Sequence, residues 1–264
     1  LRKLTMPAFS KPVMAKIDAK IRDLITECFD AIGDAEEFDV YAAIASKLPV
    51  RAIARMIGVP ATDEEFFHDF GVNVIKGTRI NLPLKERNAS IEATLPGFQF
   101  FLDQIKERRA AATPGDDFLG SLVGAVVDGE RLDDYEILSV VFALITAGSD
   151  TATDLHTFAL NGLLTNPDQY ELLKSKPEIM ENAIIELLRY GSFGKMPFFR
   201  FATADYEFAG QQIAKGEAIG VNISAAWNDP KKYPDWDKLD LQRRLDGNLV
   251  FGAGAHFCIG TYLV

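Results

Sequence analysis

The longest uninterrupted helical pattern, Asp134 to Thr165, is the strongest constraint on the fold. It contains no proline, and Asn166-Pro167 ends it, because the residue before a proline is disfavoured in helical conformation. Thirty-two residues in a helix span about 48 Å. The apolar residues of its first half are Ile137, Leu138, Val140, Val141, Phe142, Leu144 and Ile145. They cover most of the circumference, so we expect a buried helix.

The middle of this helix is unexpectedly polar. It reads Thr146-Ala147-Gly148-Ser149-Asp150-Thr151. A glycine in a helix interior costs about 1 kcal/mol relative to alanine, and an unpaired buried carboxylate costs more. Residues that weaken an element at its centre indicate a functional site. The alternative is a helix kinked at Gly148, with its hydroxyls bonded back to the preceding turn.

A second signal lies near the end of the chain, where Cys258 follows Phe251, Gly252, Gly254 and His256 and precedes Gly260. A thiolate that contacts a flat cofactor needs small neighbours, and glycines also let backbone N–H groups turn toward the sulfur. Such N–H groups tune a metal held by the sulfur. If Gly260 and Thr261 begin a helix, its positive end also favours the thiolate.

The sequence of this loop suggests two other interpretations. A free buried cysteine in a glycine-rich turn is the structural alternative. A dinucleotide-binding loop is excluded, because position 257 is Phe where that motif needs glycine and no strand–helix unit follows.

Composition limits the class of protein. The chain has 264 residues and a net charge of −10, which argues against a nucleic-acid partner. Its length allows one large domain or two small ones. Cys28 sits at helical spacing among apolar residues, so we predict that it is a core residue. We find no signal peptide and no apolar run of membrane-spanning length, and therefore expect a cytoplasmic protein without a membrane partner.

Three motifs together resemble one family. Phe-x-x-Gly-x-His-x-Cys-x-Gly at 251–260 is similar to the haem-ligand signature of the cytochrome P-450 family, with His256 where many members have arginine. Ala147-Gly148-x-Asp150-Thr151 resembles its oxygen-binding groove. Glu186-x-x-Arg189 resembles its Glu-x-x-Arg motif, and the three motifs occur in the family's order.

The resemblance runs from Arg2 to Gly260, nearly the whole chain. It implies a mainly α fold with small β elements, the cytochrome P-450 fold, incomplete at both termini. We expect residues 1–264 to form one partial haem-thiolate domain. The chain begins without Met and ends six residues after Cys258, so we expect it to be a fragment.

The resemblance also implies roles for individual residues. Cys258 would be the metal ligand of a heme b cofactor. Asp150 would relay protons from solvent, and Thr151 would hydrogen-bond in the oxygen-binding groove, where a local opening of the helix makes room for oxygen and water. The remaining cofactor-binding residues would be Ala147 and Gly148 in the groove, Phe251, Gly252, Gly254 and Gly260 in the loop, and Arg2, Arg200 and His256 at the haem propionates.

The Glu-x-x-Arg motif would be structural, with an arginine from a later segment as its third member. Lys238 stands at the expected place, and a lysine cannot reproduce a bidentate guanidinium fork. Arg243 or Arg244 could replace it.

The implied activity is that of a monooxygenase. It would insert one atom of O2 into a small apolar or aromatic substrate, with electrons from NAD(P)H through a reductase and a ferredoxin. Basic residues Arg2, Lys3, Lys11 and Lys16 would form the ferredoxin-docking face. Two alternatives remain: a peroxide-dependent haem-thiolate enzyme, which commonly lacks the Asp150–Thr151 pair, and a folded remnant without haem.

Other segments give expectations of local structure. We expect two helices in 1–32, a helix in 39–60 broken at Pro49, and helices at 63–77, 90–112 and 168–191. Strands are expected in 196–224, with a hairpin at 206–217. Clusters around Phe67 and Phe101 are expected to be core packing, with a pocket role as the alternative. The residues that hint at a substrate pocket are Phe193, Lys195, Met196 and Phe198, and Asp154 and His156 are expected on the helix exterior.

Overall fold

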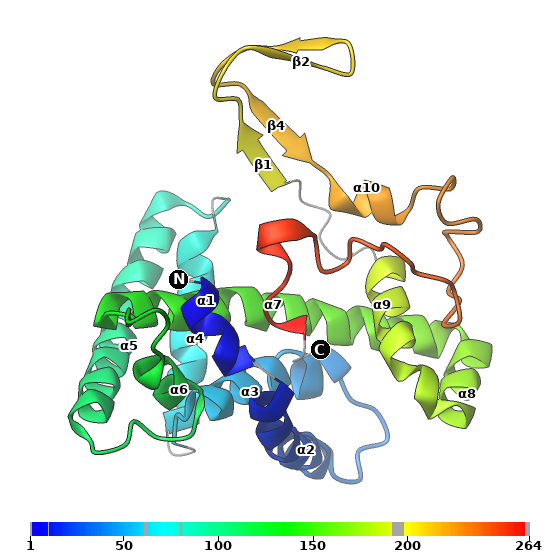
Figure 1. The fold of residues 1–264 in the computed structure, drawn as a ribbon. Coiled ribbons are helices and arrows are strands. Elements are labelled where there is room, and N and C mark those ends of the chain that lie inside the picture. The colour runs from blue at the N-terminus through cyan, green and yellow to red at the C-terminus, as the bar shows by residue number, and fades with distance from the viewer. Residues whose placement is uncertain (1, 10, 61–62, 80, 192–197, 262–264) are drawn as a thin grey trace. The chain divides into compact units, whose positions relative to one another are not determined.

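The structure, a computed structural model, describes residues 2–9, 11–60, 63–79, 81–191 and 198–261 (Figure 1). It is mainly helical with two small two-stranded sheets, which confirms the expected fold class. Contacts within the chain divide it into two compact units. The first unit comprises Leu1–Thr157 and Ile259–Val264, and the second comprises Phe158–Cys258. The expectation of a single domain stays a prediction.

The first unit is a cluster of helices around one apolar core. Its elements are α1 (Arg2–Thr5), η1 (Met6–Phe9), α2 (Lys11–Ile32), the π-helical turn η2 (Tyr41–Ala45), α3 (Leu48–Ile57), α4 (Glu64–Thr78), α5 (Leu84–Ala110), α6 (Phe118–Gly124) and most of α7 (Asp134–Thr165). Cys28, on α2, is buried as predicted.

Proline positions explain two differences from the predicted helices. Pro49 does not break a helix but lies in the first turn of α3, where its missing N–H costs no hydrogen bond. Gly58 ends that helix as expected, with φ of 94° in the left-handed region. Helix α5 begins earlier than predicted, at Leu84, and continues through Pro96.

Helices α4 and α5 lie side by side in the first unit and share an aromatic cluster (Figure 1). Phe67 and Phe101 are each 1% exposed and Phe70 is 3% exposed. Their rings meet at centroid distances of 5.7 to 6.4 Å. These three phenylalanines are therefore core residues, as predicted.

The closest approach in this cluster occurs at Gly97 of α5. A Cβ atom built there would lie 2.2 Å from Cδ2 of Phe70, whose ring is enclosed by Phe67, Phe98 and Phe101. We predict that Gly97→Ala destabilises the protein by about 1–3 kcal/mol despite the better helix propensity of alanine. Urea denaturation would measure the loss. Gly71→Ala on α4 is the control, because this glycine is also helical and a Cβ there would meet its nearest neighbour, Cγ2 of Ile145, at an ordinary contact distance of 3.6 Å; a loss at Gly97 no larger than at Gly71 would contradict the packing argument.

Helix α7 has the predicted bounds, Asp134–Thr165. It begins with a capping box, in which Asp133 N–H donates to Glu136 Oε2 (2.9 Å) and Glu136 N–H donates to Asp133 Oδ1 (2.7 Å). One face carries Ile137, Val141 and Ile145, each at most 1% exposed.

The burial of α7 is, however, incomplete. Ala147, Asp150 and Thr151 are exposed on the other side of the helix, so the expectation of a buried helix holds for one face only. The helix is also long and apolar enough, by length and composition, to cross a membrane. This corrects the expectation that no apolar run reaches membrane-spanning length. The core helix of a non-membrane protein passes the same test.

The second unit contains the remaining helices and both sheets. After the end of α7 its elements are α8 (Pro167–Ser175), η4 (Pro177–Ile179), α9 (Met180–Tyr190), β1 (Phe198–Phe201), β2 (Tyr206–Phe208), β3 (Gln211–Ile213), β4 (Ala218–Val221), α10 (Ile223–Trp227) and η5 (Gly254–His256). The predicted helix 168–191 is interrupted at η4, because Pro177 cannot continue the hydrogen-bond ladder of α8.

The predicted strands pair in two antiparallel ladders (Figure 1). Strand β1 pairs with β4, with Phe198 opposite Val221, and β2 pairs with β3 in the expected hairpin. The hairpin turns at Ala209 and Gly210, whose φ values of 51° and 80° suit a tight two-residue turn. Phe198 is 54% exposed. Phe193, Lys195 and Met196 lie outside the described residues.

Candidate active site

The cysteine loop has a backbone that requires glycine. Gly252 and Gly254 have φ values of 72° and 68°, in the region that L side chains rarely adopt. The loop closes when the N–H of Cys258 donates to the carbonyl of Phe251 at 2.9 Å, and the N–H of Phe257 donates to Gly254 at 3.1 Å. The side chain of Cys258 is exposed, so the alternative of a buried structural cysteine was wrong.

Two further observations are consistent with a flat apolar cofactor on this loop. A Cβ atom added at Gly254 would meet nothing within 4 Å, so the glycine faces open space. Phe257 beside the thiol is 42% exposed, and its ring lies 6.5 Å from that of Phe251. An exposed thiol, glycines and an exposed aromatic ring are consistent with a covering haem. Thr261 begins a helical turn, but the residues after it lie outside the described part of the chain.

The predicted groove lies on the exposed face of α7, within the first unit. Gly148 packs closely on its other side, where an added Cβ would be 3.0 Å from Cδ1 of Ile53. The helix is unbroken here, so the expected local opening is not seen. Instead, Oγ1 of Thr151 donates to the carbonyl of Ala147 at 2.5 Å, and Oγ1 of Thr146 donates to Phe142 at 3.0 Å. This back-bonding is the alternative that the residues alone had left open.

Asp150 has a partner that the sequence did not reveal. Nη2 of Arg79, the residue that follows α4, lies 3.4 Å from Oδ2 of Asp150, and both side chains are about half exposed. The pKa of Asp154 is raised, first by partial burial and then by the charge of Asp150, while Arg79 acts in the opposite direction. No motif contains Arg79, and 71 residues separate it from Asp150, so sequence reasoning had no signal for it.

His156 differs from its prediction. The ring is half-buried rather than exterior, and Nδ1 is fully shielded without a hydrogen-bond partner in the described part of the protein. Burial lowers the pKa of His156. The neutral imidazole is therefore favoured.

The Glu-x-x-Arg motif forms a buried ion pair in the second unit. Arg189 is 1% exposed and Glu186 is fully buried. Their contact is bidentate, with Nε to Oε2 at 2.7 Å and Nη2 to Oε1 at 2.8 Å. Nη1 of Arg189 also donates to the carbonyls of Trp236 (2.9 Å) and Trp227 (3.3 Å). The pair therefore ties α9 to the segment that precedes the cysteine loop.

Arg243 is the third member of this network. Its Nε lies 3.1 Å from Oε1 of Glu186, and its side chain is 10% exposed. Its other nitrogens donate to the carbonyls of Pro234, Asp235 and Lys238 at 2.6 to 3.0 Å. Among the described residues, Arg244 forms its ion pair with exposed Asp246 and not with Glu186. Of the two arginines left open by the sequence, Arg243 is the one that fits.

Lys238 contributes to this network only through its backbone. Its carbonyl accepts from Arg243, whereas its ammonium group pairs with Asp235 at the surface. A flexible lysine is sufficient at this position because Arg243 supplies the planar fork.

The three residues predicted for the propionates are exposed, and they are divided between the two units, with Arg200 and His256 in the second. Arg2 is on α1 in the first unit. Arg200 is on β1, where Nη1 donates to the carbonyl of Phe199 (2.9 Å), and His256 ends η5. Gly260 belongs with the first unit, and Phe251, Gly252, Gly254 and Cys258 belong with the second. Their haem contacts stay predictions.

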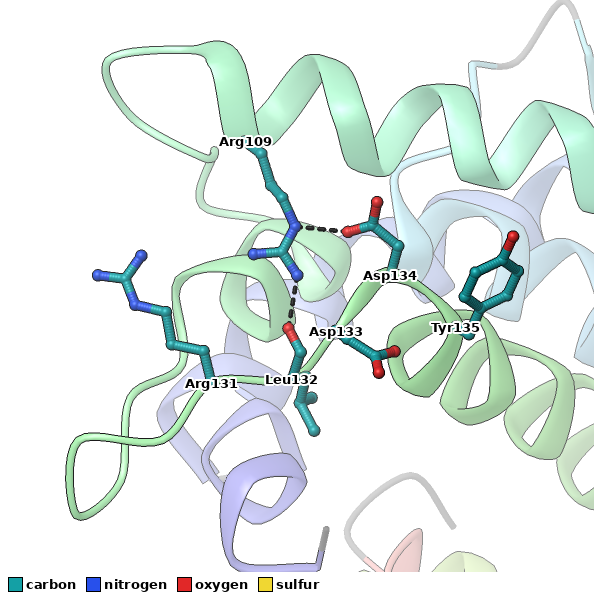
Figure 2. Close-up of a pocket in the computed structure, with 6 residues that line it drawn as sticks. All are labelled: Arg109, Arg131, Leu132, Asp133, Asp134 and Tyr135. Atoms are coloured by element: carbon teal, nitrogen blue, oxygen red, sulfur yellow. Dashed lines mark hydrogen bonds and ion pairs between the residues drawn. The ribbon is translucent and has the colours of Figure 1, made fainter.

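An open surface pocket of about 540 Å³ lies elsewhere in the first unit, where α7 begins (Figure 2). Arg109 crosses it, with Nε 2.6 Å from Asp134 and Nη2 donating to the carbonyl of Leu132 (Figure 2). Arg131, Asp133 and Tyr135 complete the lining. None of the predicted site residues lines this pocket, so it is not the candidate active site.

Comparison with known proteins identifies the family of the chain. The family model for cytochrome P-450 matches residues 83–263. The epothilone C/D epoxidase of Sorangium cellulosum is 32% identical over 265 residues, which cover 100% of this chain and 63% of that protein. The 6-deoxyerythronolide B hydroxylase of Saccharopolyspora erythraea is 31% identical, with the same coverage.

Solved structures give the same result. The cytochrome P-450 PksS of Bacillus subtilis 168 matches with a TM-score of 0.90 and 27% identity, over 99% of this chain and 66% of that one. CYP109E1 of Bacillus megaterium, in complex with corticosterone, matches with a TM-score of 0.90, 28% identity and coverages of 99% and 70%. The chain spans 63% of the length of the curated relatives named above. It belongs to the cytochrome P-450 family.

Proposed function

We propose that this protein is a haem-thiolate monooxygenase that inserts one atom of O2 into a small apolar or aromatic organic substrate. The observation that carries the proposal is the exposed thiol of Cys258 in a glycine loop of a cytochrome P-450 chain. The names of its relatives support the reaction class, because they include an epoxidase and a hydroxylase. When bound, haem b would supply the activation of O2, and its thiolate ligand would favour O–O cleavage.

The proposed binding roles follow from exposure and charge. Cys258 holds the iron, and the glycines of its loop leave room for the cofactor. Ala147 and Gly148 are small and let α7 pass over the cofactor, and Phe251 and Gly260 flank the thiolate loop. Arg2, Arg200 and His256 neutralise the propionates.

The proposed proton path begins at Asp150. Its exposed carboxylate can exchange protons with solvent, as a relay group requires. Thr151 is the next residue of the helix and is also exposed. Its hydroxyl proton is used by the carbonyl of Ala147, but its oxygen lone pairs remain able to accept a hydrogen bond. The hydroxyl therefore orients a proton donor in the groove.

We predict that Thr151→Ala lowers the product formed per NAD(P)H consumed by about a hundredfold, the lower end of the usual range of general acid–base contributions. Haem binding survives, because the side chain is exposed and supports no core contact. Thr146→Ala is the matched control, since it removes the same kind of back-bonded hydroxyl one and a half turns earlier. Equal coupling in the two variants would remove Thr151 from the mechanism.

The proposed electron donor is a ferredoxin reduced from NAD(P)H. The chain and a ferredoxin would both be acidic, so docking requires a local positive face. Arg2 and Lys3 are exposed on α1; the side chains of Lys11 and Lys16 lie outside the described part of the chain. We predict that Lys3→Glu slows reduction by ferredoxin and weakens its salt dependence. Stopped-flow reduction at several ionic strengths tests this, and unchanged rates and salt dependence would exclude this face.

The substrate class is proposed on two grounds. Phe198 is an exposed aromatic side chain on β1, and the related CYP109E1 binds the apolar steroids corticosterone and testosterone. A cytoplasmic location is proposed because NAD(P)H is generated there. Full-length protein, reconstituted with haem, reductase and ferredoxin, should yield oxygenated product. Faster turnover with hydrogen peroxide alone would favour the peroxide-dependent alternative, and absence of haem binding would favour the folded remnant.

A further inference from the structure

Helix α5 carries a seven-residue repeat along one of its sides. Apolar residues recur at alternating intervals of four and three residues, with one asparagine among them, and the six positions are Leu84, Asn88, Ile91, Leu95, Phe98 and Leu102. With the repeat lettered a to g, these are its d and a positions, through which two helices pack along a common seam. We call the six residues the α5 seam.

The α5 seam is covered at one end and exposed at the other. Phe98, which follows Pro96 in the helix, packs against the core of the first unit. Before Pro96, Leu84 and Leu95 are each 61% exposed and Ile91 is 46% exposed. Large apolar side chains that stand together on a surface indicate an interaction site. The exposed part of the seam, here called the outer seam, consists of Leu84, Asn88, Ile91 and Leu95.

Helix α4 leaves the outer seam accessible. The two helices lie side by side in the first unit (Figure 1), and the side of α5 that meets α4 is marked by buried Thr94, Gly97 and Phe101. The middle of the outer seam lies about 120° around the helix from that side. Ile91, at the edge of the seam, also approaches Gly77 of α4. A further helix can therefore pack along the outer seam without displacing α4.

The charges beside the outer seam match those of a second α5. Arg87 and Glu92 flank the seam at positions g and e, and neither side chain has a hydrogen bond or an ion pair among the residues that the structure describes. They point about 140° apart around the helix, so they do not pair with each other within one α5. In two parallel helices in register, position g of one faces position e of the other, five residues further along. Each Arg87 then meets the Glu92 of the second copy.

Asn88 favours the same parallel arrangement. In a parallel pair of helices, a single asparagine at position a meets its own equivalent, and the hydrogen bond between the two fixes the register and the number of helices. In an antiparallel pair that aligns Leu84 with Leu95, Asn88 would lie opposite Ile91. Its amide would then be buried without a partner, which is unfavourable.

We propose that two copies of this protein associate through their α5 helices, which lie parallel and in register with the outer seams in contact. The same patch serves on both partners, as in a two-fold symmetric dimer. The relatives named above are longer than this chain, so a segment of the same protein outside this chain is the competing occupant. The charges argue for a second copy, because a second α5 supplies both Arg87 and Glu92 with an opposite charge.

Sedimentation equilibrium of the full-length protein tests the association. It should show monomers and dimers in exchange, and Leu95→Glu should raise the dissociation constant by about a hundredfold or more, because it sets two like charges opposite each other. Leu164→Glu is the control, since Leu164 on α7 is 65% exposed away from the seam. Arg87→Glu should also weaken the dimer, and the addition of Glu92→Arg should restore it. A monomer at every concentration, or a dimer indifferent to these changes, would overturn the proposal.

Disulfide cross-linking of the full-length protein tests the parallel arrangement. Under mild oxidation, Leu95→Cys should form a covalent dimer, whereas the wild type, with only its own Cys28 and Cys258, should not. In an antiparallel pair, Leu95→Cys would instead link to Leu84→Cys when the two variants are mixed, and that result would overturn the parallel arrangement. If Leu95→Cys neither cross-links nor reacts with a soluble thiol reagent, another segment of the protein covers the seam and the proposed dimer is excluded.

Discussion

Cys258→Ser in the full-length protein abolishes the thiolate-type spectrum of the reduced carbon monoxide complex and all NAD(P)H-driven product formation. This is the largest effect that we expect, because a serine hydroxyl is neither deprotonated at neutral pH nor a soft ligand for iron. The fold should survive, since the side chain is exposed and packs into no core. Absorbance after reduction under carbon monoxide is the measurement.

The other cysteine of the chain provides the control. Cys28 is 4% exposed on α2 and packs as a small apolar residue. Cys28→Ala should cost some stability but leave the spectrum unchanged. A thiolate-type spectrum retained by Cys258→Ser, or lost in Cys28→Ala, would contradict the assignment of the ligand.

The sequence predicted those features that depend on local chemistry. The bounds of α7 follow from the absence of proline and from Asn166-Pro167 at its end, and the cysteine loop follows from glycines whose φ values no other residue adopts easily. The Glu186–Arg189 pair follows from helical spacing. In each case the residues that specify the structure are close together in the sequence.

Features that depend on distant residues were not predictable in this way. The third arginine could not be chosen between Arg243 and Arg244, because the choice depends on which side chain turns toward a buried carboxylate. Arg79 was missed for the same reason. The burial expected for α7 holds for one face only, because apolar residues around a helix do not say which faces other segments cover.

Removal of Glu186 is the second large effect that we expect. The carboxylate is fully buried between two guanidinium groups and also accepts from the N–H of Asp240 at 3.2 Å. Glu186→Leu leaves Arg189 and Arg243 in the interior without a counter-charge. Breaking a buried pair in this way costs about 3–5 kcal/mol. The free energy of unfolding of a typical domain is only about 5–15 kcal/mol, so the loss is a large part of it.

Unfolding of the second unit can be followed separately. Both tryptophans of the chain, Trp227 and Trp236, lie in this unit, and both of their carbonyls accept from Arg189. Urea denaturation followed by the fluorescence of these two residues therefore reports on the network. In Glu186→Leu the fluorescence midpoint should move to a much lower urea concentration.

Three single substitutions decide which cation completes the network. Arg243→Ala should destabilise strongly, because it empties four hydrogen-bonded positions around a buried group. Lys238→Ala and Arg244→Ala should each cost about 0–1 kcal/mol, as exposed ion pairs usually do, since their side chains are 70% and 91% exposed. A larger loss at Lys238 than at Arg243 would show that the lysine is the third member. The order Arg243 far above Lys238 and Arg244 would instead establish that the guanidinium fork of Arg243 is the third member of the network.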